Sequence, residues 1–362
     1  MLFGVVLIAI TRPFSTDAYI SYSTRQYPGT FDNPAPSREN IELLVQAISR
    51  LAGDNRLANH PIRRYSNDPN FSAHITFDNP ALSSMDVSAL VLSDNQIIIA
   101  SDKGQDYYLK ALAHEFIHVA MNEKYGRTSY SNFLSPEDYA FQNLMEEAFG
   151  TAIEAWVQLV YPEIPNNLSV RNWGKQTGLS TVIDAMRNDF AESFPDISTE
   201  RINTLVAIEI FCMTMILENI YSLRIIPKNM AVSYGQENTF LIPEYAVYRE
   251  RGDALLRHKW NYLASMMPFT IPEPYTYDYF RDRFKSDYTR WAARAPSSDN
   301  SILHWVNFPA EEQARARIAR QRPEDRRYNY LPPEYEARLN RVMQEIDPNF
   351  IPVDTARQGG RR

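Results

Sequence analysis

The pattern that most constrains the fold is a pair of histidines on one face of a largely apolar helical stretch. Residues 106–124 carry apolar side chains at helical spacing, and the sequence HEFIH occupies residues 114–118 within them. Histidines four residues apart lie one above the other on a helix, so both imidazoles can reach one Zn²⁺. A buried histidine pair needs partners, and one metal ion satisfies both rings at once.

Glu115 directly follows the first histidine of the motif. One residue step turns a helix by about 100°, which places this carboxylate beside the metal rather than on it. There it can take a proton from the water that zinc activates. We therefore expect His114 and His118 to bind one zinc ion per chain and Glu115 to act as the general base. The alternative is a helix that carries two histidines without any function.

Composition restricts the ligands that such a metal could use. Cys212 is the single cysteine, which excludes an intramolecular disulfide, a thiolate zinc site and an iron–sulfur cluster. Histidine and carboxylate remain as ligands. The net charge of −7 disfavours a nucleic-acid binder, which needs a basic face. The hydrophobic content of 44% is ample for a packed core and excludes a fully disordered chain.

A catalytic zinc site needs a third protein ligand and an open position for water. No histidine or aspartate follows His118 at the spacing of HExxHxxGxxH, but a helix predicted over 135–161 contains MEEAFGTA at residues 145–152. Small residues surround its carboxylates and would let two helices approach closely. Either Glu146 or Glu147 can serve as the third ligand, and a solvated helix face is the alternative interpretation.

HEFIH and the downstream MEEAFGTA resemble the gluzincin branch of the zincin metallopeptidases. They are similar in particular to neurotoxin and secreted-effector proteases with HELIH followed by a Glu-Glu motif. The resemblance covers about residues 70–160 and implies that Glu147 binds the metal, while Glu146 supports it without binding. Ala148 and Phe149 replace the Leu-Arg type residues of that family, which keeps Glu146 open as the alternative third ligand.

The expected architecture is α+β and zincin-like, with a small N-terminal β-sheet, an active-site helix and a mainly helical C-terminal lobe. Short β-like runs are predicted at 73–77, 89–92 and 96–100, the last two forming a hairpin. Helices are predicted over about 37–53, 106–124, 135–161, 180–193, 199–223, 277–293, 310–321 and 333–346, with an irregular segment over 225–275. The expected divisions are a lead-in over 1–36 whose residues 11–36 are polar and proline-rich, a catalytic lobe over 37–163, a helical lobe over 164–308, and a charged extension over 309–362 whose tail from 347 is disordered.

The function expected is zinc-dependent hydrolysis of peptide bonds in a peptide or protein substrate. One alternative is a catalytically inactive zincin-like scaffold or binding module. Another is a secreted toxin or effector protease with one narrow protein substrate. Candidates for stabilising the oxyanion of the transition state are Tyr245, Tyr248 and His258.

The N-terminal residues bear on where the protein is located relative to the cell. Residues 2–10 form an uncharged apolar run that is too short to span a bilayer, which takes about 20 residues. Such a run suits the core of a signal peptide, although no Lys or Arg precedes it, and a buried β-strand is the alternative. We expect no integral membrane span, secretion if residues 1–18 act as a signal peptide, and a cytoplasmic protein otherwise.

Overall fold

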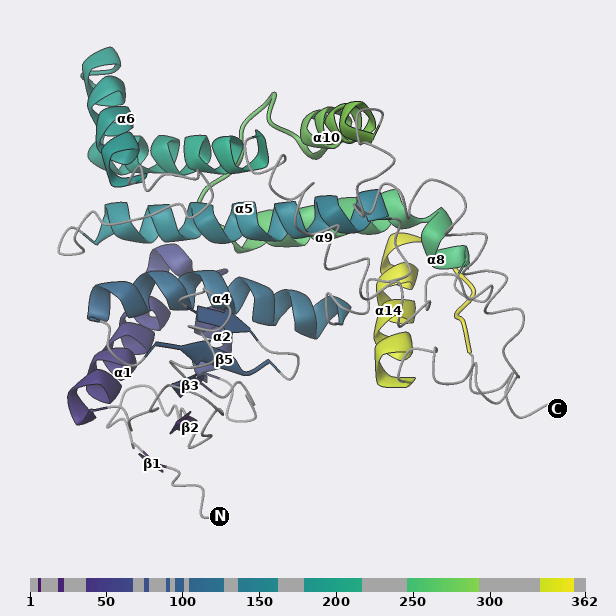
Figure 1. The fold of residues 1–362 in the computed structure, drawn as a ribbon, viewed down its shortest axis with the longest axis horizontal. Coiled ribbons are helices and arrows are strands. Elements are labelled where there is room, and N and C mark those ends of the chain that lie inside the picture. Colours follow the sequence, from purple (N-terminus) through teal and green to yellow (C-terminus); the bar gives the residue numbers. More distant parts are fainter. Residues whose placement is uncertain are drawn as a thin grey trace, which may run out of the picture. The chain divides into compact units, whose positions relative to one another are not determined.

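The structure is a computed structural model that describes residues 6–7, 19–22, 37–67, 75–77, 89–91, 95–100, 104–126, 136–161, 179–216, 246–292 and 333–354. These residues are predominantly helical and include a small sheet, so the expected α+β class is confirmed (Figure 1). The chain separates into unit 1 (Met1–Ala120, Ala148–Phe211 and Leu263–Thr270) and unit 2 (Met121–Glu147, Cys212–Tyr262 and Ile271–Arg362). Helices α4 (Gln105–Tyr125) and α5 (Pro136–Val160) are each divided between the two units, with one part of the helix in unit 1 and the other part in unit 2.

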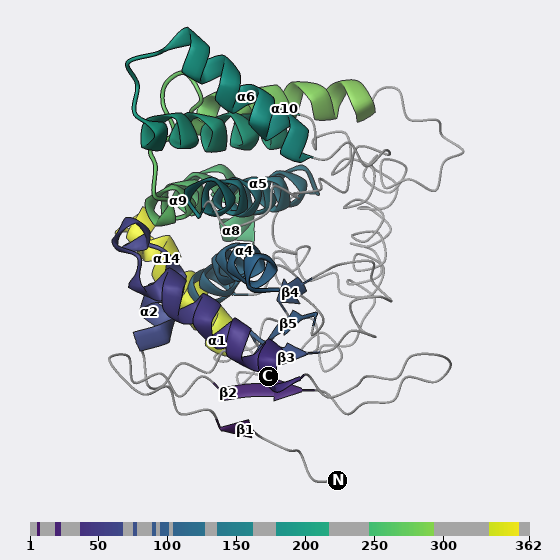
Figure 2. The same cartoon turned by 90° about the vertical axis from the view of Figure 1, so that its left-hand side faces the viewer.

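The sheet of unit 1 has its strands in the order β1-β2-β3-β5-β4, a succession visible in Figure 2. Their bounds are β1 Val6–Leu7, β2 Tyr19–Tyr22, β3 Ile75–Phe77, β4 Ala89–Val91 and β5 Ile97–Ile99. Strands β2, β3 and β5 run parallel, whereas β1 and β4 pair antiparallel with their neighbours. Every residue of β3 and β5 is buried, as expected for their continuous apolar runs. The predicted hairpin is confirmed by the antiparallel pairing of β4 with β5.

The helix that carries HEFIH packs on this sheet. Tyr108 makes an edge contact with Phe77 of β3, with ring centroids 6.2 Å apart. Tyr107 packs against the small cluster around Ile98 of β5. These contacts fix the first turns of α4 against the sheet, and most later residues of the helix are buried as well.

Several further helices belong to unit 1. Helix α1 (Arg38–Gly53) begins after Ser37, whose hydroxyl accepts the amide hydrogen of Asn40 at 3.0 Å, as predicted for an N-cap. Helix α2 (Pro61–Asn67) packs on α1 and was not predicted. Helix α6 (Leu179–Ser193) follows, and a helix over residues 199–216 contacts α5 through the side chain of Asn203, which donates to the carbonyl of Leu159 at 3.1 Å.

Unit 2 is built around aromatic contacts between α5, α9 (Gly252–Met266) and α10 (Tyr277–Ala292). Trp260 of α9 lies 5.9 Å from Phe280 of α10, measured between ring centroids. Phe141 of α5 lies 5.2 Å from Phe284 in the same way. Trp260, Phe280, Phe141 and Phe284 are all buried, so these rings form the core of the unit.

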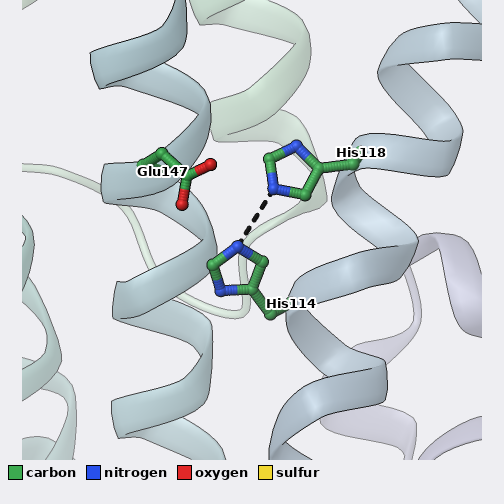
Figure 3. A group of neighbouring side chains, drawn as sticks. All are labelled: His114, His118 and Glu147. Carbon is green, nitrogen blue, oxygen red and sulfur yellow. Dashed lines mark hydrogen bonds between the residues drawn. The ribbon is translucent and has the colours of Figure 1, made fainter. Parts of the chain in front are cut away.

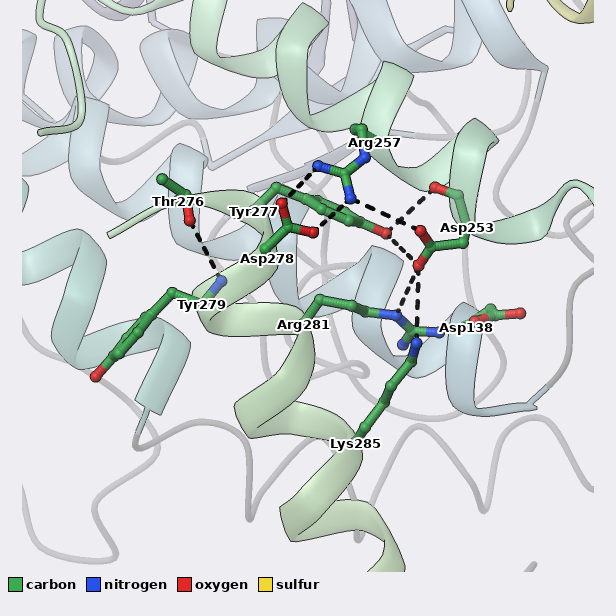
Figure 4. A network of polar contacts seen from close by, with 9 residues as sticks. All are labelled: Asp138, Asp253, Arg257, Thr276, Tyr277, Asp278, Tyr279, Arg281 and Lys285. Atoms are coloured by element: carbon green, nitrogen blue, oxygen red, sulfur yellow. Dashed lines mark hydrogen bonds and ion pairs between the residues drawn. The ribbon is translucent and has the colours of Figure 1, made fainter. Parts of the chain in front are cut away.

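Buried Arg281 ties the beginnings of the same three helices together (Figure 4). Its guanidinium contacts Asp138 in the first turn of α5, Glu137 at 3.2 Å and Asp253 in the first turn of α9 at 3.4 Å. Acidic side chains in the first turn of a helix also interact favourably with the positive end of the helix dipole. A second arginine, Arg257, pairs with Asp278 on the exposed side of this network.

Helix α14 (Pro333–Ile346) packs on the end of α4 within unit 2. The guanidinium of Arg338 donates at 2.9 Å to the carbonyl of Asn122 in the last turn of α4, which also accepts the backbone amide hydrogen of Gly126 at 2.9 Å. Gly126, at φ 82°, ends that helix, and a Cβ there would lie 2.8 Å from the ring of Tyr335. Glycine is therefore required at this position both by conformation and by space.

Parts of the sequence interpretation are wrong. The segment 225–275 is not irregular throughout, because it contains α8 (Ala246–Glu250) and all of α9. The expected lead-in over 11–36 contains β2. The expected disordered tail is ordered at residues 347–354, since the Asn340 amide pairs with both backbone groups of Val353 at 2.7 and 3.0 Å.

The expected helix over 310–321 lies outside the described residues, as do residues 217–223 and 355–362. No helix in the described part of the chain has the length and apolar character needed to cross a bilayer.

Candidate metal centre

The two histidines of HEFIH form a pair whose ring nitrogens face each other. Nε2 of His114 lies 3.0 Å from Nε2 of His118, with ring centroids 5.0 Å apart (Figure 3). The spacing of four residues on α4 produces this alignment, because one helical turn stacks the two Cβ atoms. Both side chains are half-buried, whereas the helix residues around them are almost all buried.

Glu147 of α5 completes a group of three potential ligands with this histidine pair. Among the described residues, these three each bring one donor atom within 4.8 Å of the other two. Figure 3 shows the carboxylate of Glu147 directed toward the two rings. The neighbouring Glu146 is turned elsewhere: it is buried, and its Oε1 accepts from the side chain of Gln142 at 2.9 Å.

The donor set and its spacing fit a zinc ion. Two nitrogens at ~2.0–2.1 Å from a tetrahedral zinc lie ~3.3 Å apart, close to the separation of the two imidazole nitrogens. Two histidines with one carboxylate leave a fourth position open, the arrangement of catalytic rather than structural zinc. The three residues therefore suit zinc in kind and number, and the two histidine nitrogens also suit it in spacing.

Gly150 lets α5 approach the histidine pair, as the small residues of this segment predicted. A Cβ at Gly150 would lie 2.7 Å from both Nε2 and Cε1 of His114. Real Cβ atoms do not approach other atoms so closely, so the ring occupies the space that a side chain would fill. Gly150 comes one turn after Glu147, which puts the glutamate and this gap on one face of α5.

Glu154 is a site residue that the sequence interpretation missed. Its Oε1 lies 2.8 Å from Nδ1 of His114. A negative charge at this distance from Nδ1 favours a proton on that nitrogen and leaves the lone pair of Nε2 available to a metal, although the contact does not have the geometry of a hydrogen bond. Its position seven residues after Glu147, two turns along the same helical face, was the signal that could have identified it.

His60, also missed, supports the backbone just before the histidine pair. Its Nε2 lies 2.9 Å from the carbonyl oxygen of Ala113, and its Nδ1 accepts the amide hydrogen of Ile62 at 3.3 Å. These contacts fit a neutral ring with its proton on Nε2. Complete burial lowers the pKa of His60 to about 4, although the hydrogen bond to Ala113 acts in the opposite direction.

Two further charged residues of α4 are buried near the site. Glu115, the expected general base, is only 8% exposed. Lys110 lies one turn before His114. Burial lowers the pKa of Lys110, while the negative charges of Glu154 and Asp106 act to raise it. The polar groups of α4 thus continue from the histidine pair toward the N-terminus of the helix.

The expected oxyanion stabilisers have other partners where they are described. The hydroxyl of Tyr248 donates to Oδ1 of Asn340 at 2.7 Å. Nδ1 of His258 lies 2.9 Å from the hydroxyl oxygen of Tyr125, and its Nε2 lies 3.3 Å from Oε2 of Glu345. Neither contact involves the histidine pair, and Tyr245 lies outside the described residues.

Comparison of the chain with protein-family models, with curated proteins and with solved structures finds no match.

Proposed function

We propose that the protein is a zinc-dependent metallopeptidase with a zincin-like active site. The observation that carries this proposal is the grouping of His114, His118 and Glu147, with donor atoms within 4.8 Å of one another. HEFIH supplies two of these ligands and a carboxylate immediately beside the first. We assign the third ligand to Glu147 rather than Glu146, because the latter is buried and bound to Gln142.

The residues of the chain divide the work of hydrolysis. A bound zinc would polarise the scissile carbonyl and lower the pKa of the attacking water. Glu115 accepts a proton from that water and delivers it to the leaving amine as the C–N bond breaks. Glu154 holds the His114 ring in the orientation that directs Nε2 toward the site. Gly150 provides the space in which that ring lies.

Metal content is the first test of this proposal. Elemental analysis of the zinc-loaded protein should give about one equivalent per chain, since two histidines and one glutamate make an open three-ligand site. His118→Ala should lose the metal. Wild-type protein that retains less than about a tenth of an equivalent would contradict the proposal.

Catalysis is tested separately by Glu115→Gln, which keeps the shape of the side chain and removes the proton acceptor. Zinc content should stay near the wild-type level, while cleavage of a peptide library, read by mass spectrometry, should fall ~10²–10⁴-fold. The variant His114→Ala should lose both the bound zinc and the peptide cleavage. If the zinc-loaded wild type cuts no peptide, the result favours an inactive scaffold instead.

A further inference from the structure

Lys259 is a fully buried lysine that the proposed chemistry does not use. It lies on α9 in unit 2 and is 2% exposed. Its Nζ donates to Oε1 of Gln142 at 2.6 Å. The same ammonium group lies 5.0 Å from the centroid of the Tyr125 ring, within the range of a cation–π contact. Lys259 therefore has defined partners on both α4 and α5.

The side-chain amide of Gln142 also contacts Glu146. Its amide nitrogen donates to Oε1 of Glu146 at 2.9 Å, while its amide oxygen faces the ammonium group. An amide satisfies both charged groups only in this orientation, because lysine has no acceptor and a carboxylate has no donor. Lys259, Gln142 and Glu146 form a continuous buried chain, which we call the lysine relay.

The relay compensates two charges that burial would otherwise disfavour. Glu146 is 4% exposed, and a buried carboxylate without a counter-charge is strongly disfavoured. Burial lowers the pKa of Lys259 to about 8, and the charge of Glu146 acts to raise it. Removing the lysine would leave Glu146 without this positive charge, which weakens the hold of the interior on its carboxylate.

The position of Glu146 matters because Glu147 is its neighbour. Adjacent residues of a helix differ by about 100°, so a rotation of α5 by one residue step would exchange the two carboxylates. Gln142 and Glu146 are one turn apart and share the buried face of α5. Glu147 is exposed and belongs to the ligand group. If Glu146 is held in the interior, Glu147 is the carboxylate that remains available to bind the metal.

We propose that Lys259, acting through Gln142, determines which glutamate of the pair binds the metal. It is a positioning residue, not a catalytic one: it keeps Glu146 in the interior and leaves Glu147 as the single competent ligand. This inference rests on the proposed metal centre. It adds to that centre a residue 117 positions from Gln142 in sequence, on a different helix.

The test uses cobalt-substituted protein, because the absorption bands of Co²⁺ report the ligands around it. Lys259→Met removes the charge and keeps an unbranched side chain. We expect an altered cobalt spectrum and a ~10–100-fold loss of zinc affinity, measured by competition with a chromophoric chelator. Lys285→Met, a control at a half-exposed lysine of α10, should leave both unchanged.

The double variant Lys259→Met/Glu146→Gln separates positioning from general support of the fold. It removes the buried carboxylate that competes for the metal, so spectrum and affinity should return to those of wild type. If Lys259→Met does not fold, as read by circular dichroism, the double variant alone carries this test. A folded Lys259→Met with wild-type spectrum and affinity overturns the inference, and so does a double variant that stays altered. Lack of zinc uptake by the wild type would instead contradict the proposed function itself.

Discussion

Gly150 and His114 approach each other so closely that the imidazole occupies the space of a missing side chain. A Cβ on Gly150 would lie 2.7 Å from Nε2, the nitrogen that faces His118. The contact is part of unit 1 and joins α4 to α5 one turn from Glu147. The same glycine therefore governs both the packing of the two helices and the position of Nε2 of His114.

Gly150→Ala is expected to impair metal binding more than a surface mutation of similar size. The added methyl group must displace His114, and overpacking of this kind typically costs ~1–3 kcal/mol. We expect a lower midpoint of thermal unfolding together with reduced zinc affinity, measured by calorimetry and by chelator competition.

Gly53→Ala is the matched control for that prediction. Gly53 also lies in a helix, but a Cβ there would meet nothing within 4 Å. Alanine is the better helix former by up to about 1 kcal/mol, so this variant should be at least as stable as wild type and bind zinc normally. Equal behaviour of the two alanine variants would contradict the close contact at Gly150.

Glu154→Gln tests whether a carboxylate must face Nδ1 of His114. The substitution keeps size and polarity but removes the charge that holds the ring proton in place. Changes of this kind at residues that contact metal ligands cost ~10–100-fold in metal affinity. Glu200→Gln, at an exposed position of the helix over 199–216, should have no effect. Unchanged zinc affinity in Glu154→Gln would remove Glu154 from the site.

His60 gives the folded protein a defined sensitivity to acid. The folded-state pKa is about 4, against an ordinary value of 6.5. Between these values the unfolded chain binds a proton that the folded chain does not, so the free energy of unfolding falls as pH falls from 6.5 to 4. The shift corresponds to roughly 3 kcal/mol in all.

His60→Gln should flatten that part of the pH profile. Glutamine keeps a donor for the carbonyl of Ala113 but does not titrate. The free energy of unfolding is measured by urea denaturation at several pH values between 4 and 7. A slope as steep in the variant as in wild type would assign the acid sensitivity to other groups.

The sequence predicted the helices of the site well because their periodicity is local. HEFIH on α4 and the Glu-Glu motif on α5 both follow from spacings of a few residues. The resemblance implied Glu147 as the third ligand, but residue spacing alone left Glu146 open. The contact of Glu146 with Gln142, and of Gln142 with Lys259, could not be predicted, because Lys259 is 117 residues away from Gln142 in a segment that was predicted to be irregular.

Other failures have the same origin. The order of residues 347–354 depends on the side-chain amide of Asn340, which forms two hydrogen bonds with the backbone of Val353, as a neighbouring strand would. This contact has no sequence signature. The borders of the two units fall inside α4 and α5, where the helical pattern continues without interruption. His60 had no recognisable spacing to HEFIH, since its role depends on the packing of α2 against α4.

Arg281 provides the last prediction, which concerns stability rather than the metal. Its side chain is 5% exposed and contacts acidic residues of α5 and α9, namely Asp138, Glu137 and Asp253. Arg281→Met should destabilise the protein by ~3–5 kcal/mol, because it removes the guanidinium that faces the partly buried carboxylates of Asp138 and Glu137. Arg257→Met, at a pair exposed to solvent, is the control and should shift the unfolding midpoint little. Denaturant titration of both variants measures the difference. The contacts of Arg281 with α5 lie in the first turn of that helix, whereas Glu147 lies two to three turns further along. We therefore expect the folded Arg281→Met protein to bind zinc with an affinity close to that of wild type. A variant that keeps full stability would mean that solvent already compensates these carboxylates.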